Sequence, residues 1–387
     1  MSRSPEMQRS PQADGADAGP AAALAFDGRT RFTYTGFAAR VLFGDGSLAA
    51  LPDEVERLGA RRALVLCTPE QREAAERAAA QLGDRAAGIH DRAAMHVPLE
   101  TAIAARDEAA RLGADCCVAV GGGSTVGLGK AIALTSGLPI VAVPSTFAGS
   151  EMTAIWGLTE GGVKKTGRDP KVLPRTVIYD PVMLETLPAK IAGPSGMNAI
   201  AHCVEALYAV DANPIVSMIA EEGIRALAES LPTVIDTAVT GEQRRAALGL
   251  AQYGAWLAGT ALNGVSMAIH HKLCHTLGGS FNLGHAETHT VVLPYATAYN
   301  REAAPQAMQR IRRALGRFGD GDAATGLQAL ARALGAPTSL REIGMPADGL
   351  DRAADLAVQN PYWNPRPIER DAIRSMLDDA WHGRAPR

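Results

Sequence analysis

Histidine is concentrated in the second half of this 387-residue chain, where five of the nine histidines lie close together. His271 and His275 are four residues apart, so they share one face of a helix. His285 follows them, and upstream Asn198 and His202 show the same spacing of four. Imidazoles exchange protons near neutral pH, because their unperturbed pKa is about 6.5. We predict that the catalytic residues are His202, His271, His275 and His285, although a single histidine is more often a structural side chain.

Histidine pairs at helical spacing also suggest a metal site, because such pairs commonly bind divalent cations. A dedicated metal site usually includes a carboxylate or a thiolate that balances the charge of the ion, whereas Asn198 offers a neutral amide. Cys203 and Cys274 are direct neighbours of histidines, so on a helix they point about 100° away from them. We therefore predict that no metal is bound and that Asn198 contacts the substrate.

A glycine-rich turn indicates where a phosphate group binds. Gly121-Gly122-Gly123-Ser124-Thr125 separates an apolar strand, residues 116–120, from a helix. Glycines let the backbone approach phosphate oxygens, and a helix N-terminus supplies free N–H groups. Val126 takes the last glycine position of the G-x-G-x-x-G fingerprint, so a plain tight turn remains the alternative.

Two further strand ends should lie at the same edge of the sheet as the glycine turn. One carries Ser145 and Thr146, and the other carries Cys67 and Thr68. Residues 68–71, Thr-Pro-Glu-Gln, also predict a helix start in which Gln71 closes a capping box. The predicted cofactor-binding residues are Gly121, Gly122, Gly123, Ser124, Thr125, Ser145, Thr146, Cys67 and Thr68.

The pattern of apolar residues predicts two domains behind an N-terminal tail. Short apolar strands alternate with amphipathic helices over residues 27–186, which predicts an α/β, Rossmann-like domain. Helical periodicity dominates residues 187–387, which predicts an all-helical domain carrying the histidines. Residues 1–26 are rich in Ala, Pro, Ser, Asp and Gly without periodicity, which predicts a disordered tail.

Composition narrows the class of protein. A net charge of −3 gives no reason to expect nucleic acid or a membrane as a partner. The five cysteines form no C-x-x-C pair, which favours a reducing compartment over a disulfide framework. We find no long apolar stretch and no signal-peptide pattern, so we expect a cytoplasmic protein.

Several runs of sequence resemble a known family. They are GGGSTVGLGKAIALT at 121–135, VPSTFAGSEMTA at 143–154, KTGRDPKVLPRTVIYDP at 165–181, GMNAIAHCVEALYAV at 196–210 and HHKLCHTLGGSFNLGHAETHTVVLPY at 270–295. The chain resembles the iron-containing alcohol dehydrogenase superfamily from about residue 30 onward, and within it the maleylacetate reductases. The resemblance implies a dehydroquinate synthase-like fold, in which a Rossmann-like domain precedes a helical one.

The resemblance also bears on the metal. The metal pattern of the superfamily is an aspartate, a histidine four residues later, and two further histidines at the spacing of His271 and His285. Asn198 replaces the aspartate, and Gly127 stands where metal-dependent relatives usually have another. Both departures agree with a branch that works without metal. His275 matches the histidine that lies near the nicotinamide in relatives.

The implied reaction is the reduction of 2-maleylacetate to 3-oxoadipate by NADH or NADPH, in the degradation of aromatic compounds. The position that often carries a ribose-binding acid has Cys67 and Thr68, so the 2′-phosphate of NADPH is not excluded. The resemblance also implies a homodimer. A small dicarboxylate substrate requires polar and cationic partners. The predicted ones are Asn198, Lys130, Lys165, Arg168, Lys171 and Lys272.

We predict that His271 and His275 hold the ketone oxygen, and that His202 and His285 complete the polar pocket. Three other functions remain open on the sequence. A metal-dependent alcohol or aldehyde dehydrogenase of the same superfamily would need an ion. A dehydroquinate-synthase-like lyase would show no net consumption of NADH. A non-catalytic nucleotide-binding protein would bind NADH and turn nothing over.

Overall fold

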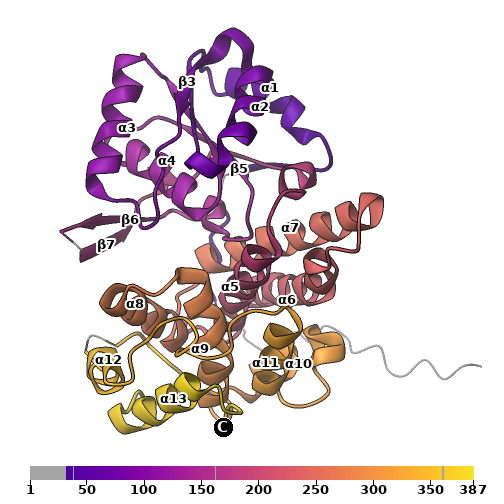
Figure 1. Cartoon of the computed structure of the whole chain (residues 1–387), viewed down its shortest axis with the longest axis vertical. Helices are drawn as coiled ribbons and strands as arrows, with labels where there is room; N and C mark the ends of the chain where they lie inside the picture. Colours follow the sequence, from indigo (N-terminus) through magenta and orange to yellow (C-terminus); the bar gives the residue numbers. More distant parts are fainter. Residues whose placement is uncertain (1–31, 38, 162, 360) are drawn as a thin grey trace, which may run out of the picture.

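The structure is a computed structural model that describes residues 32–37, 39–161, 163–359 and 361–387. The predicted tail at residues 1–26 lies outside the described residues. Figure 1 shows an α/β domain stacked above a helical domain, with the long helices α5 and α7 at the level where the two meet. The predicted order of a Rossmann-like domain followed by a helical domain is therefore confirmed.

The first domain is built on one parallel sheet with the strand order β1-β8-β5-β4-β2-β3. From β2 the chain moves outward to β3 and then returns to the other side of β2 to form β4. The order therefore reverses between β2 and β4, and ligands of such sheets bind at the carboxyl ends of the strands at this point. The strands are β1 Arg40–Phe43, β2 Ala63–Leu66, β3 Ala86–His90, β4 Cys116–Gly121, β5 Ile140–Pro144 and β8 Thr176–Tyr179.

Helices cover both faces of this sheet, because its strands are apolar on both sides. Val65 and Val118 pack with the helices α1 and α2, whereas Leu64 and Cys117 pack with α3 and α4 on the opposite face. Successive side chains of a strand point to opposite faces, which explains this division. The helices are α1 Leu51–Arg57, α2 Arg72–Leu82, α3 Leu99–Arg111 and α4 Gly123–Ser136.

A hairpin and nine helices complete the described chain. The hairpin pairs β6 Ile155–Glu160 with β7 Val163–Arg168 in antiparallel register, apart from the main sheet. The predicted domain boundary falls in the loop that precedes α5. The helices are α5 Ala189–Tyr208, α6 Pro214–Ile235, α7 Gly241–Gly264, α8 Ile269–Phe281, α9 His285–Tyr299, α10 Pro305–Ala314, α11 Ala323–Ala333, α12 Gly349–Ala357 and α13 Arg370–His382.

The loop after β5 joins the two domains by a close backbone contact. Gly149, in this loop, has a φ of 75° and lies against Gly259 of α7. A Cβ on Gly149 would lie 3.0 Å from the Cα of Gly259 and 3.6 Å from Nδ1 of His202. Nearby, the backbone N–H of Phe147 donates to Ser195 Oγ of α5 at 3.0 Å. The loop thus brings the sheet edge next to the predicted catalytic histidines.

All five cysteines are free and buried. Burial raises the pKa of the Cys67 thiol to about 11 and that of Cys116 to about 12, and it raises the pKa of Cys117, Cys203 and Cys274 as well. None of the helices in the described part of the chain combines the length and the apolar character that a membrane crossing needs.

Candidate active site

The glycine turn lies at the point where the strand order reverses. It follows β4, and Gly122 is the N-cap of α4, where no side chain accepts from the first N–H groups of the helix. A Cβ on Gly121 would lie 2.3 Å from Gln71 Oε1, and one on Gly122 would lie 2.9 Å from Thr146 Oγ1. A side chain at either position would therefore collide with its neighbours, whereas glycine lets the backbone pack closely at the start of α4. This arrangement fits the pyrophosphate of a dinucleotide.

The other predicted cofactor residues lie around the same turn with different exposure. Ser145 and Thr146 follow β5, the neighbour of β4 in the sheet. The predicted capping box does not form: Thr68 makes no capping hydrogen bond. The Gln71 side chain donates to Ser145 Oγ instead. Thr125 is fully buried, and its hydroxyl has no partner among the described residues. Cys67 is fully buried in the core beneath the edge, whereas Thr68 is half-buried at the edge itself.

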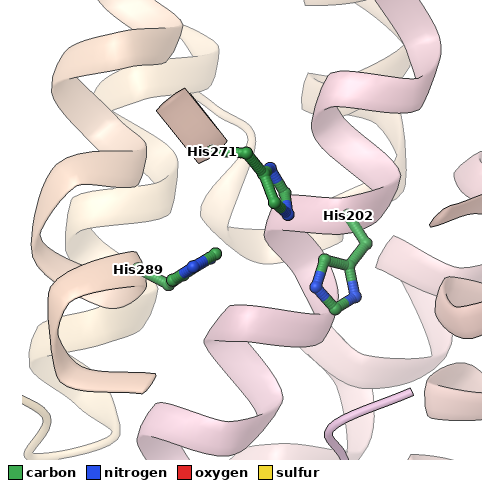
Figure 2. Close-up of side chains that lie close together, drawn as sticks. All are labelled: His202, His271 and His289. Atoms are coloured by element: carbon green, nitrogen blue, oxygen red, sulfur yellow. The ribbon is translucent and has the colours of Figure 1, made fainter. Parts of the chain in front are cut away.

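Three imidazoles from three helices converge below this edge. His202 comes from α5, His271 from α8 and His289 from α9, and Figure 2 shows the three rings turned toward a common centre. The ring centroids of His202 and His271 are 5.2 Å apart, and those of His271 and His289 are 4.9 Å apart. His202 Nδ1, His271 Nε2 and both ring nitrogens of His289 are buried without a hydrogen-bond partner among the described residues. These polar atoms are available to a ligand.

Two of the predicted histidines lie at the exposed side of this cluster. The His285 ring lies 4.2 Å from that of His289, and the His275 ring lies 6.2 Å from that of His271, centroid to centroid. Both side chains are exposed, although the protein around them lowers their pKa, that of His275 to about 4. Burial lowers the pKa of His202, His271 and His289 well below the usual value. The free cluster is therefore uncharged at neutral pH.

Asn198 lies on α5 one turn before His202, as its spacing predicted. It is 3 % exposed, and its amide oxygen has no partner among the described residues. Near His275 the segment between α12 and α13 brings in Tyr362, whose Oη is 3.2 Å from His275 Nδ1. The Lys272 ammonium lies 5.9 Å from the centroid of the Tyr362 ring. Asn198 and Lys272 are thus both next to the histidines.

The other predicted cations are bound to protein groups. Lys165 pairs with Glu160 across the hairpin, and Lys171 pairs with Asp169 at 3.3 Å. Arg168 donates to the backbone oxygen and to the amide oxygen of Asn263 on α7, at 3.0 and 2.9 Å. Lys165 and Lys171 therefore already have acidic partners, and their predicted contact with the substrate stays a prediction. Burial lowers the pKa of His275 and His285, and the positive charge of Lys164 lowers it further.

Lys130 holds the loop after β5 in place. Its fully buried ammonium donates to the backbone oxygens of Ser150 and Ile155 at 2.6 and 2.8 Å, and to Thr153 Oγ1 at 2.9 Å. Burial lowers its pKa to about 7. The predicted contact of Lys130 with a substrate or phosphate does not fit these bonds, because they occupy its N–H groups.

We expect the variant Lys130→Met to lower the free energy of unfolding by about 3 kcal/mol. Each buried acceptor left without a donor costs about 1–3 kcal/mol, and the apolar replacement recovers part of this by packing. Urea denaturation measures the loss. The matched control is Lys190→Met, at an exposed lysine of α5, which should change stability by less than about 0.5 kcal/mol. Equal losses in the two variants would show that Lys130 has no such role.

The structure adds residues that the sequence prediction omitted. His289 follows His285 at the same spacing of four as the other pairs, so the sequence does indicate it. Glu205 lies three residues after His202 and thus on the same helix face. Nothing in the sequence places Tyr362 beside His275, because the two are far apart in the chain.

The histidine cluster also has to be considered as a metal centre. The nitrogens of His202, His271 and His289 all lie within 4.8 Å of one another. These ligand atoms suit a divalent cation, but three neutral imidazoles and the amide of Asn198 leave its charge unbalanced. The nearest carboxylate, Glu205, contacts Nδ1 of His271 and not the three convergent nitrogens. The donor atoms of the cluster therefore fit a metal ion, but these neutral ligands do not balance the charge of the ion.

Two family models match most of the described chain. Residues 38–181 match the family model of iron-containing alcohol dehydrogenase, and residues 193–381 match the model described as Fe-containing alcohol dehydrogenase family, C-terminal. Maleylacetate reductase from Burkholderia cepacia is 58% identical over 347 residues, which cover 90% of this chain and 97% of the relative.

Two crystal structures have the same fold. One is a putative alcohol dehydrogenase from Ralstonia eutropha JMP134, with 59% identity and a TM-score of 0.90 over 93% of this chain and 100% of that one. The other is maleylacetate reductase from Agrobacterium tumefaciens, with 50% identity and a TM-score of 0.87 over 92% of this chain and 100% of that one. The chain therefore belongs to the iron-containing alcohol dehydrogenase family, in its maleylacetate reductase group.

Proposed function

We propose that this protein reduces 2-maleylacetate to 3-oxoadipate with NADH or NADPH, and that it does so without a bound metal. The observation that carries the proposal is the cluster of imidazoles with unpartnered buried nitrogens, next to an uncapped helix N-terminus that suits a dinucleotide. Relatives that are more than half identical carry the name of this reaction. We further propose that the protein acts in the cytoplasm as a homodimer.

In this proposal the α/β domain binds the cofactor. The N–H groups at the start of α4 bind the pyrophosphate, and the hydroxyls of Ser145 and Thr146 bind beside them. NADH or NADPH supplies the hydride. Because Thr68 carries no negative charge, it does not repel the 2′-phosphate of NADPH. The loop after β5 passes from this site to His202, and it aligns the cofactor with the substrate.

The helical domain stabilises the charge that develops on the substrate. When the carbon β to the ketone gains a hydride, negative charge builds up on the ketone oxygen, and the resulting enolate then needs a proton. His271 and His275 meet these two needs in the proposal, and His202 and His285 extend the polar surface. A dianionic substrate raises the pKa of nearby imidazoles, so binding itself favours their protonation. Lys272 and Lys164 offer positive charge for the two carboxylates.

A second candidate is a metal-dependent alcohol dehydrogenase, which the convergent nitrogens of His202, His271 and His289 favour. One experiment tests both functions. Purified protein is mixed with NADH and freshly prepared maleylacetate, and the nicotinamide absorbance is followed before and after treatment with a chelator. We expect one NADH oxidised per maleylacetate, with a kcat of about 1–10³ s⁻¹ that the chelator leaves unchanged.

Three results would count against the proposal. A rate that the chelator abolishes and an added divalent metal restores would support the metal-dependent alternative. Consumption of an alcohol, but not of maleylacetate, would do the same. Binding of NADH without any turnover would indicate a nucleotide-binding protein.

A further inference from the structure

A fully buried carboxylate lies behind the central histidine of the site. Glu205, on α5, is 0 % exposed, and its Oε2 lies 2.7 Å from Nδ1 of His271. The backbone N–H groups of Ala268 and His270 also donate to Glu205, at 2.9 and 2.8 Å. These two residues stand at the start of α8, where no side chain of the helix itself provides a cap. One carboxylate therefore contacts both the helix N-terminus and the imidazole.

The contacts of Glu205 indicate that it is ionised. Three backbone N–H groups, those of Ala268, His270 and His271, donate to its two oxygens, and such a set of donors stabilises the ionised carboxylate. Burial raises the pKa of Glu205, and the N–H groups of Ala268, His270 and His271 oppose this rise. An ionised carboxylate can only accept hydrogen bonds, so the Nδ1 atom of His271 carries a hydrogen.

A second contact leads independently to the same tautomer. His270 Nε2 lies 3.0 Å from the backbone oxygen of His289, so this nitrogen must donate. Burial lowers the pKa of His270 to about 4, so its ring is neutral and its Nδ1 carries only a lone pair. That Nδ1 lies 3.4 Å from Nδ1 of His271. Two lone pairs would repel each other at this distance, so the hydrogen belongs to His271.

We propose that Glu205 is a positioning residue, which holds His271 with Nδ1–H toward itself and Nε2 toward His202 and His289, so that Nε2 takes up and donates the proton of the reaction. The inference deepens the proposed reductase function and rests on it. It also revises the role of His271, because neutral Nε2 can only accept a hydrogen bond. His271 donates when it is an imidazolium, a form that the bound dianionic substrate and the negative charge of Glu205 together favour.

The π bond of the C=C group breaks and two C–H bonds form. NADH or NADPH supplies a hydride to the carbon β to the ketone and becomes NAD⁺ or NADP⁺. The imidazolium of His271 supplies the Nε2 proton to the other carbon and becomes neutral, and a proton from water restores it. His275 then remains the donor to the ketone oxygen.

The simpler interpretation is that Glu205 only caps α8, as carboxylates do at helix N-termini. A cap affects folding, whereas a positioning residue also affects turnover in the folded enzyme. The first measurement therefore needs no change at Glu205. In protein labelled with ¹⁵N-histidine, the nitrogen shifts of His271, assigned by their loss in His271→Ala, should show a protonated Nδ1 and a bare Nε2. A protonated Nε2 in the neutral ring would overturn the proposal.

The second measurement separates turnover from stability with the isosteric variant Glu205→Gln. We expect kcat with maleylacetate to fall about 10²-fold, while KM and the Kd of NADH change less than about threefold. The matched control is Glu108→Gln, because Glu108 Oε2 lies 2.6 Å from Nδ1 of His90 in the α/β domain. That variant should keep kcat within about twofold. The conservative variant Glu205→Asp, which keeps the charge, should recover part of the lost kcat.

The outcomes distinguish this inference from the proposed function. If wild-type protein does not reduce maleylacetate, the function fails, and the nitrogen shifts still test the tautomer. If wild-type protein is active and folded Glu205→Gln keeps kcat within about threefold, Glu205 is a cap alone and the inference fails. If Glu205→Gln does not fold, the active fraction of Glu205→Asp decides: a kcat per folded molecule equal to that of wild type contradicts the inference.

Discussion

Replacing His271 by alanine should lower kcat for maleylacetate by about 10²- to 10⁴-fold, the range that a positioned proton donor contributes. We expect the largest loss of activity at this histidine. Glu205 contacts its Nδ1, and its Nε2 is buried beside His202 and His289 without a partner among the described residues. The Kd of NADH should stay within about threefold, since the glycine turn belongs to the other domain. Steady-state kinetics together with NADH fluorescence titration measure both quantities.

The control for His271→Ala is His90→Ala. His90 is likewise buried and paired with a glutamate, so both variants leave a similar gap. Its loss should reduce stability and leave kcat per folded molecule within about twofold of wild type. Near-normal turnover in His271→Ala would remove this residue from the reaction and would leave His275 as the acid.

The second large effect is expected at the contact between the two domains. Gly149→Ala should lower the free energy of unfolding by about 2–4 kcal/mol, because two penalties add. A left-handed backbone costs a non-glycine residue about 1–2 kcal/mol, and a Cβ placed 3.0 Å from the Cα of Gly259 forces α7 away at a cost of about 1–3 kcal/mol. Urea unfolding followed by circular dichroism measures the sum.

Gly137→Ala separates these two penalties. Gly137 ends α4 with a φ of 74°, and a Cβ there would meet no atom within 4 Å. Its loss should be only the backbone penalty of about 1–2 kcal/mol. Gly149→Ala should in addition raise KM for maleylacetate, because the same Cβ approaches His202. If the two variants are equally stable and equally active, the contact between Gly149 and Gly259 does not set the position of the loop.

Most of the fold could be predicted because its signals are local. The apolar run at residues 116–120 became β4, and the strand end expected before Cys67 became the end of β2, Ala63–Leu66. β3, Ala86–His90, gives no such run. It is a half-buried edge strand of mainly small residues. It forms a strand because it pairs with β2, and its own composition gives little sign of this.

The part of the candidate site that lies on a single helix face could be predicted from the sequence. Spacing alone grouped His271 with His275 and Asn198 with His202. Spacing could not decide whether Lys164 or Lys165 points toward the histidines. Neighbouring residues of a strand face opposite sides, and only the position of the hairpin in the fold determines which side faces the site. The contacts of Glu205 could not be predicted either. Its partners are more than sixty residues away in the sequence, and a glutamate inside an apolar helix gives no sign of what it will contact.

The burial of the cysteines has a consequence for the durability of the enzyme. A ketone conjugated to a C=C bond, as in the proposed substrate, alkylates thiolates. The thiolate is the reactive form, and the raised pKa of each of the five thiols keeps it scarce at neutral pH. All five side chains are also shielded from solvent. The five thiols are thus poor targets for alkylation by the substrate, and we expect repeated turnover to leave them unmodified.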